Sequence, residues 1–509
     1  MKLIKKEYIK ILEWGFKIAY LLLGLSTFNS FIYDSPIQPA LVKVCLFLGV
    51  LAAAGRLLFL KDYIKTPYLP MLVLFCISFC LTIVVNWKYN AGVEDLKWVI
   101  WTGFIFFLLY TCDRTRSRNS YKKEFHILAD ILIVLSVICA LASIYLLLQN
   151  YHNLWTTESG EVLIAGFQWG RLWGVYTDPN YGGVFSVAAI LLCVYFILIR
   201  KGLCRIWYVL AICADYIYMI FSDSRTAEVT MCAGAGVILL LLLYSRRKNW
   251  KGIAVGFLLT SAFAVAFVGG TSALKGWYNE QIEAQTQQRS REENIVSETE
   301  ENMEESAGEN AGNSEENSGK PAADTGNAPA SSPEQESEET PQEPETEEQE
   351  TVGRAQDIQT DVSNGRFDLW KSGIEIWKTK PVTGTGYNSF LPYVEETLPD
   401  TYVVNNDQGN YVSLHNGYLN ILVYQGILGA AISLVFIGGV LWSWCRGIKR
   451  VPRKDSLYIT FLTAVIVVIA VSMLFLLEGV YTNSPGTFIL WNFLGYLMHY
   501  FSNQAEEKR

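Results

Sequence analysis

The stretch NGYLNILVYQGILGAAISLVFIGGVLW, residues 416–442, decides the fold class because it contains no charged residue over a length that can cross a bilayer. A membrane helix needs about 20 consecutive apolar residues to cross roughly 30 Å of hydrocarbon. Comparable apolar runs recur along most of the chain, in which 51% of the residues are hydrophobic and 14% are aromatic. Soluble folds do not repeat such runs. The sequence therefore predicts an all-α, polytopic membrane protein.

The apolar runs predict about twelve membrane-spanning helices. Their approximate bounds are 12–33, 40–60, 68–86, 95–112, 125–148, 182–200, 205–221, 226–244, 250–269, 416–442, 456–477 and 484–502.

Basic residues set the predicted topology. Lys and Arg are concentrated in the N-terminal segment and in every second connection, for example DRTRSRNSYKK at 113–123 and CRGIKRVPRK at 445–454. Cytoplasmic loops of membrane proteins carry such an excess of basic residues. Both termini are therefore predicted to be cytoplasmic, and the alternate connections are predicted to face the extracytoplasmic side.

This topology divides the chain into five parts. They are the first five helices in 1–148, an outer loop at 149–181, four helices in 182–269, a large outer loop at 270–415 that precedes helix 10, and three helices in 416–502. Function is expected in the two long outer loops, because connecting segments carry a disproportionate share of binding and catalytic residues.

A disordered acidic insert, at about 280–360, is predicted inside the large outer loop. Its residues 291–350 contain twenty Asp or Glu against one Arg and one Lys, with abundant Ser, Asn, Gly and Pro. Such a composition cannot bury enough apolar surface to fold. The insert carries a net charge of −18 while the whole chain carries −8, so the remainder is basic. We interpret the insert as a solvated spacer and assign it no chemistry; binding of cations or of a basic partner is the alternative.

An amphipathic helix, at about 364–380, is predicted after the insert, with Phe367, Trp370 and Trp377 on one face. Arg366 lies in its first turn. A second arginine, Arg225, follows the predicted N-cap Ser224 in the segment SDSRTAE. An arginine beside free helical N–H groups suits a phosphate. The alternative for Arg225 is a side chain that reaches toward the membrane interface.

The first long outer loop ends in FQWGRLWGVYTDPNYGG, residues 167–183, which is rich in Trp, Tyr and Gly. Arg171 lies among these aromatic residues, and Asp178 and Asn180 follow in a turn. Aromatic faces with carboxylate and amide groups suit a sugar-binding rim. An aromatic belt at the membrane interface is the competing interpretation.

The segment HNGYLNILVYQGILG begins at His415 and Asn416, where helix 10 is predicted to leave the outer surface. A histidine can deprotonate a hydroxyl near neutral pH. Structural histidines are more frequent, so His415 alone does not indicate catalysis. Gly426 and Gly429 lie deeper in the same helix, where small residues allow close helix packing.

Four motifs occur in order: GRLWGVYTDPN, SRTA, NGRFDLW with GTGYNSF, and HN followed nine residues later by GILG. Together they resemble the O-antigen ligase and O-antigen polymerase superfamily of bacterial membrane glycosyltransferases. The HN, nine residues, GxxG pattern is the most specific. The resemblance covers roughly residues 165–445, and the predicted topology and large outer loop agree with it. The acidic insert departs from the family in its length but interrupts no motif.

The resemblance implies a polyprenyl-diphosphate-linked oligosaccharide as the donor, on the extracytoplasmic side of the bacterial cytoplasmic membrane, with no nucleotide sugar, cofactor or metal. Arg225 and Arg366 would then hold the diphosphate, and His415 would position or deprotonate an acceptor hydroxyl. Arg171 matches the family less closely, and it joins Asp178, Asn180, Asn416 and Trp370 as predicted substrate-binding residues.

The sequence thus predicts direct displacement at the anomeric carbon with inversion, assisted by His415 and by charge stabilisation from the arginines. The acceptor would be a glycan, a lipid or a wall polymer, with membrane lipid around the chain and no nucleic acid. Polymerase and ligase cannot be separated from these residues. A twelve-helix transporter is the alternative function, although no similarity between the two halves of the chain is visible.

Overall fold

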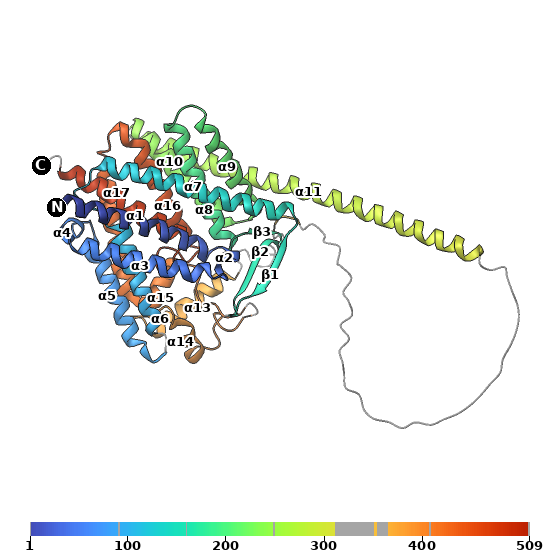
Figure 1. Ribbon diagram of the computed structural model, residues 1–509, viewed down its shortest axis with the longest axis horizontal. Helices are drawn as coiled ribbons and strands as arrows, with labels where there is room; N and C mark the ends of the chain where they lie inside the picture. The colour runs from blue at the N-terminus through green and yellow to red at the C-terminus, as the bar shows by residue number, and fades with distance from the viewer. Residues whose placement is uncertain are drawn as a thin grey trace, which may run out of the picture. The chain divides into compact units, whose positions relative to one another are not determined.

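The computed structural model describes residues 2–89, 92–158, 160–247, 250–310, 351–353, 365–406 and 409–506. The chain divides into two compact units, one made of Met1–Lys275 with Val352–Arg509 and the other of Gly276–Thr351. Most of the described chain is helical (Figure 1).

The helices are α1 (Lys2–Thr27), α2 (Ser30–Tyr33), α3 (Ile37–Leu57), α4 (Leu60–Tyr63), α5 (Leu69–Val85), α6 (Gly92–Phe104), α7 (Arg118–Leu148), α8 (Pro179–Ile199), α9 (Cys204–Phe221), α10 (Arg225–Arg247), α11 (Trp250–Asn310), α13 (Arg366–Thr379), α14 (Phe390–Thr397), α15 (Gly417–Ile448), α16 (Ser456–Ser472) and α17 (Pro485–Glu506). The strands are β1 (His152–Thr156), β2 (Val162–Gln168) and β3 (Arg171–Gly174).

Among the described residues, eight helices are long and apolar enough to cross a membrane: α3, α7, α8, α9, α10, α11, α15 and α16. The shorter apolar helix α5 joins them. The expectation of a polytopic, mainly helical membrane protein is therefore supported. A helix also lies at each of the twelve predicted positions, while the number of spans and the sidedness of the chain remain predictions.

Helices α8 and α16 lie at the centre of the first unit. In the apolar window of α8, 78% of the residues are buried, and in that of α16 the share is 67%, against 17% for α3. Both central helices are apolar on every side, which is the composition of a helix surrounded by other helices. The peripheral helices instead expose large apolar side chains, such as Phe47 and Leu434, as a lipid-facing surface requires.

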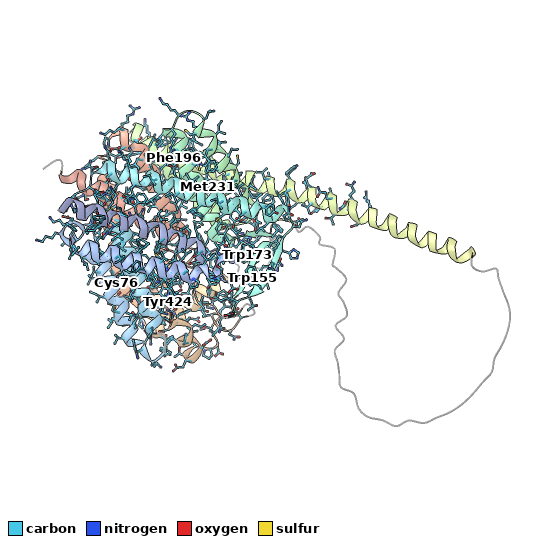
Figure 2. The ribbon with its side chains drawn as sticks, viewed as in Figure 1. Cys76, Trp155, Trp173, Phe196, Met231 and Tyr424 are labelled. Atoms are coloured by element: carbon cyan, nitrogen blue, oxygen red, sulfur yellow. The ribbon has the colours of Figure 1, made fainter. Side chains whose placement is uncertain are left out.

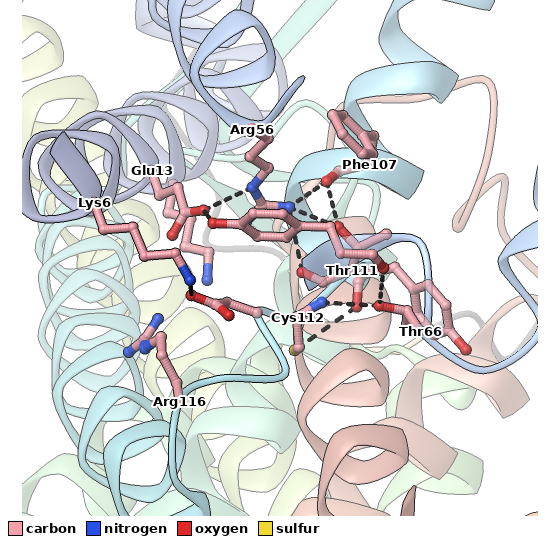
Figure 3. Close-up of polar contacts among 12 residues, drawn as sticks. Lys6, Glu13, Arg56, Thr66, Phe107, Thr111, Cys112 and Arg116 are labelled. Carbon is pink, nitrogen blue, oxygen red and sulfur yellow. Dashed lines mark hydrogen bonds and ion pairs between the residues drawn. The ribbon is translucent and has the colours of Figure 1, made fainter. Parts of the chain in front are cut away.

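Basic segments that are far apart in sequence meet at one end of the first unit. Lys6 forms ion pairs with Asp62 at 2.8 Å and with Asp113 at 3.2 Å. Nearby, Arg56 pairs with Glu13 at 2.7 Å (Figure 3). The contact between the N-terminal segment and the connections near residues 62 and 113 agrees with the prediction that these segments share one side of the membrane.

A small antiparallel sheet, with the strand order β1-β2-β3, differs from the all-α expectation. It lies away from the beginning of α1 (Figure 1), and Trp155 and Trp173 belong to it (Figure 2). The sheet is held by α2 and α7, because the Ser30 hydroxyl donates to the Ile164 carbonyl at 2.7 Å and the Val175 N–H donates to Ser143 Oγ at 3.1 Å. The aromatic loop is thus ordered by docking onto helices.

The acidic insert differs from its prediction over its first part. Residues 280–310 are helical, as the end of α11, where disorder was predicted. The sequence of this part is rich in Glu and Gln, which have high intrinsic helix propensity. The rest of the insert, apart from residues 351–353, lies outside the described residues, as does Asn364 at the start of the predicted amphipathic helix. That helix is present as α13.

Helix α15 is interrupted at Gly426, whose φ of 64° and ψ of −163° are not helical. The segment from Pro381 to Gly386 fills the break: the Ile427 N–H donates to the Pro381 carbonyl at 2.8 Å, and the Gly386 N–H donates to the Tyr424 carbonyl at 2.9 Å. These bonds satisfy backbone groups that the break leaves without helical partners. Gly426 therefore allows the interruption of helix α15, whereas the sequence predicted that it allows close packing between helices.

Replacing Gly426 by alanine should destabilise the folded chain strongly. Its backbone conformation is essentially restricted to glycine and costs about 1–3 kcal/mol for other residues, and a Cβ here would overlap the Val382 carbonyl. Thermal unfolding in detergent should show a midpoint several degrees lower. Gly438→Ala in the same helix is the matched control, since a Cβ there meets nothing within 4 Å. Equal midpoints for the two variants would contradict this account of the break.

Candidate active site

The start of α15 places His415 in an unusual backbone conformation. Asn416 is the N-cap residue, and its Oδ1 accepts hydrogen bonds from the N–H groups of Tyr418 at 3.1 Å and Leu419 at 3.0 Å. His415, immediately before it, has a φ of 47°. A non-glycine residue with positive φ is uncommon and persists only where its surroundings hold it. The Asn416 cap and the fixed turn therefore define where the imidazole lies.

Helix α13 lies against this turn and brings Arg366 to it. The Trp370 indole N–H donates to the Leu414 carbonyl at 3.1 Å. Arg366 is the first residue of α13, and its guanidinium carbon lies 5.9 Å from the centre of the Phe475 ring. One hydrogen bond thus anchors α13 next to His415, and the arginine lies at the helix N-terminus, where the helix dipole is positive.

The start of α8 is fixed by a polar network around Asn180. Asp178 is the N-cap residue, and its Oδ1 accepts from the Asn180 N–H at 2.7 Å and the Asn180 side-chain amide at 2.9 Å. Asn180 Oδ1 accepts from Arg171 at 3.1 Å and from the Ser224 hydroxyl at 2.9 Å. Arg171 is only 8% exposed and also donates to the Ser222 carbonyl at 2.9 Å. These contacts are with protein groups, which indicates a bracing role.

The same network carries the start of α10. Ser224 caps this helix, because its hydroxyl accepts from the Ala227 N–H at 3.2 Å, as the sequence predicted. Arg225 is the first residue of α10 and is half-buried. Lys275 forms ion pairs with Asp223 at 2.6 Å and with Glu228 at 3.2 Å. Lys275 thus pairs with both of the carboxylates that flank Arg225 in the sequence.

His415, Asp178 and Arg366 interact electrostatically. Burial lowers the pKa of His415, the negative charge of Asp178 opposes that change, and the positive charge of Arg366 adds to it. The imidazole is therefore predominantly neutral at neutral pH, with a carboxylate that can stabilise its protonated form. A neutral imidazole can accept a proton from a hydroxyl group.

Four helix N-termini are linked by these interactions: Asn180 joins α8 to α10, His415 couples α15 to α8, and α13 lies against Leu414. Each N-terminus carries a partial positive charge. Together with arginines at two of them, the arrangement favours a polyanion such as a diphosphate.

A comparison with known protein families matches residues 208–434 to the family described as O-antigen ligase. Residues 208–434, called the O-antigen ligase domain below, are thus similar to that family. The match covers somewhat less than half of the chain and confirms the resemblance that the motifs predicted. Arg225, Arg366 and His415 all lie inside the O-antigen ligase domain, whereas Arg171 and Asp178 precede it. No curated protein matches the chain.

The structure brings most of the predicted site residues into one connected group. Asp178 and Arg366 both act on His415, and Arg225 follows Ser224 in the adjoining network. The hydrogen bonds described above for Asn416, Asn180 and Trp370 hold helix ends in place. Their predicted role in binding substrate therefore stays a prediction.

Sequence reasoning missed the connection between α16 and α17, residues 473–484. Phe475 lies beside Arg366, and the Leu477 backbone bonds with the Tyr181 hydroxyl at 3.0 Å. The one visible signal was Glu478, a single carboxylate in the otherwise uncharged segment LFLLEGVY.

Proposed function

We propose that this chain transfers a glycan from a polyprenyl-diphosphate carrier to an acceptor hydroxyl at the extracytoplasmic surface, as a polymerase or ligase of a surface polysaccharide. The O-antigen ligase domain supports a membrane glycosyltransferase activity in general. The observation that carries the finer assignment is the electrostatic group of His415, Asp178 and Arg366 at adjoining helix N-termini.

In the proposed reaction, the acceptor hydroxyl oxygen attacks the anomeric carbon while the bond from that carbon to the diphosphate oxygen breaks. The hydroxyl proton passes to a neutral ring nitrogen of His415, and the bonding electrons leave with the diphosphate. Asp178 stabilises the imidazolium that forms. Arg366 and Arg225 stabilise the charge that develops on the leaving oxygen. Single displacement inverts the anomeric configuration.

An apolar cavity supports a lipid-linked donor. It has a volume of about 220 Å³ and lies between α5, α15, α16 and α17, with Phe75, Ile432 and Leu490 among its lining residues. Tyr418, in the first turn of α15, also lines it, so the cavity reaches the helix end that follows His415. A hydrocarbon chain is the ligand that such a lining suits.

The break in α15 is the one observation that favours transport, because discontinuous helices line the substrate sites of many transporters. Here, however, hydrogen bonds from the segment Pro381–Gly386 occupy the break. The break is thus filled by protein, and the O-antigen ligase domain does not favour a transporter.

The test uses membrane vesicles that contain the full chain and a labelled polyprenyl-diphosphate oligosaccharide. We expect label to move from the lipid to an acceptor: a ladder of lengths identifies a polymerase, and single transfer to a distinct acceptor identifies a ligase. Vesicles without the chain provide the control. Label that crosses the membrane unchanged would favour transport, and lipid-bound label that stays unaltered would refute the proposal.

A further inference from the structure

The connection between α16 and α17 supports the turn that carries His415. The N–H of Gly417, two residues after His415, lies 2.7 Å from the Met473 carbonyl oxygen and 3.0 Å from that of Leu476. A Cβ on Gly417 would lie 3.1 Å from the Glu478 carbonyl oxygen. The first turn of α15 therefore rests directly on the backbone of residues 473–478.

The same connection reaches the two other elements of the candidate active site. The Tyr181 hydroxyl donates to the Leu477 carbonyl and accepts from the Leu477 N–H, both at 3.0 Å. Tyr181 belongs to the first turn of α8, which Asp178 caps. Phe475 lies beside Arg366 of α13. Residues 473–478 thus contact α8, α13 and α15 where Asp178, Arg366 and His415 lie.

The buried carboxyl group of Glu478 anchors the connection between α16 and α17. Glu478 is 2% exposed, and its Oε2 lies 2.5 Å from the Ser472 hydroxyl oxygen. That hydroxyl oxygen also lies 2.8 Å from the Ile469 carbonyl oxygen. A hydroxyl has one hydrogen to donate. Both contacts are satisfied when Ser472 donates to Ile469 and a protonated Glu478 donates to Ser472.

The surroundings of Glu478 favour this neutral form. A Cβ on Gly486 would overlap the carboxyl group, which places it against the first turn of α17. Burial raises the pKa of Glu478 to about 7, and the stabilisation that the Ser472 and Ser484 hydroxyls offer to the ionised form only partly opposes that change. Tyr181 of α8 and Tyr176, which precedes that helix, are titratable groups that line a small cavity together with Glu478.

We propose that Glu478 is a positioning residue for His415: its neutral carboxyl group, bonded to Ser472, fixes residues 473–478 and through them the ends of α15 and α8. The inference rests on the proposed function and adds a residue outside the O-antigen ligase domain, which ends at residue 434. A displacement of about 1 Å at a catalytic group can cost about 10²-fold in rate. Loss of this anchor should therefore reduce kcat.

Two substitutions separate positioning from bulk packing. Glu478→Gln keeps the shape and a group that can donate to Ser472, so kcat should stay within about twofold of the unmodified chain at pH 6. Glu478→Met keeps a similar volume but no strong hydrogen bond, so the chain should fold while kcat falls by about 10-fold or more. The KM for the donor should change little in either variant, because the group does not contact substrate.

The pH dependence of kcat distinguishes a positioning role from a purely structural one, because a purely structural role of Glu478 would not change it. In the unmodified chain, kcat should fall as the pH rises through about 7, since ionised Glu478 can no longer donate to Ser472. Glu478→Gln cannot ionise and should lack that fall. Asp215→Asn is the matched control, because Asp215 is also a fully buried carboxyl group bonded to a serine, Ser136, at 2.6 Å. Its kcat and pH profile should equal those of the unmodified chain.

The measurements are glycan transfer in vesicles and thermal unfolding of each variant in detergent. Full activity of folded Glu478→Met, or the same fall above pH 7 in Glu478→Gln, would overturn the positioning role alone. An unmodified chain that transfers no glycan would overturn the proposed function and this inference with it. If Glu478→Met is inactive and Glu478→Gln is active at equal folded fractions, the result supports both the proposed function and the positioning role of Glu478.

Discussion

Replacing His415 by alanine is expected to lower kcat for glycan transfer by a factor of ~10²–10⁴, the usual contribution of a general base. The KM for the lipid-linked donor should change little, because the diphosphate is assigned to the arginines. His152→Ala is the matched control, since His152 is an exposed histidine on β1. Transfer rates in vesicles, normalised to the amount of folded chain, provide the measurement.

The pH dependence should identify His415 as the base. Its pKa is lowered, chiefly by burial, so the imidazole stays neutral to a lower pH than an exposed histidine, and kcat falls only as the pH drops through that lowered value. Asp178→Asn removes a charge that raises the pKa. The acidic limb of its profile should therefore move to lower pH. A limb that stays unmoved in Asp178→Asn, or His415→Ala with undiminished kcat, would remove His415 from the mechanism.

The sequence was sufficient to predict the positions of the helices, because a membrane span is a local property of length and composition. It was insufficient for the break in α15, since a GxxG pattern is equally compatible with close helix packing. What distinguishes the two is the distant segment Pro381–Gly386, which bonds to the freed backbone groups. The sheet was missed for a similar reason, because contacts from Ser30 and Ser143 on other elements hold it in place.

Within the site, the motifs located His415, Arg225 and Arg366, but they could not assign partners. The binding of sugar by Asp178 stays a prediction, and the structure adds its coupling to His415. Arg171 was expected at a sugar-binding rim, but it is buried and bonded to Ser222 and Asn180. Such pairings depend on which helix ends meet in space, and a single sequence carries little information on that.

Replacing Arg366 by alanine should lower kcat by a factor of ~10²–10³, as the loss of one group that stabilises a developing oxyanion does elsewhere. Arg225→Ala should have an effect of the same order. Lysine at either position should restore only part of the rate, because it keeps the charge but lacks the planar fork that binds two phosphate oxygens. Arg205→Ala, an exposed arginine on α9, should leave the rate unchanged.

The two arginines can be told apart by the pH profile of kcat. Arg366 lowers the pKa of His415 by charge repulsion, so Arg366→Ala should raise that pKa and move the acidic limb of the profile to higher pH. Arg225→Ala should also lower the rate but move the limb less than Arg366→Ala does, because the charge of Arg366 acts on His415. If both variants moved the limb equally, or neither did, the electrostatic group of His415, Asp178 and Arg366 would not be the site of the reaction. A shifted limb in Arg366→Ala alone would place the diphosphate-binding arginine and the base in one active site.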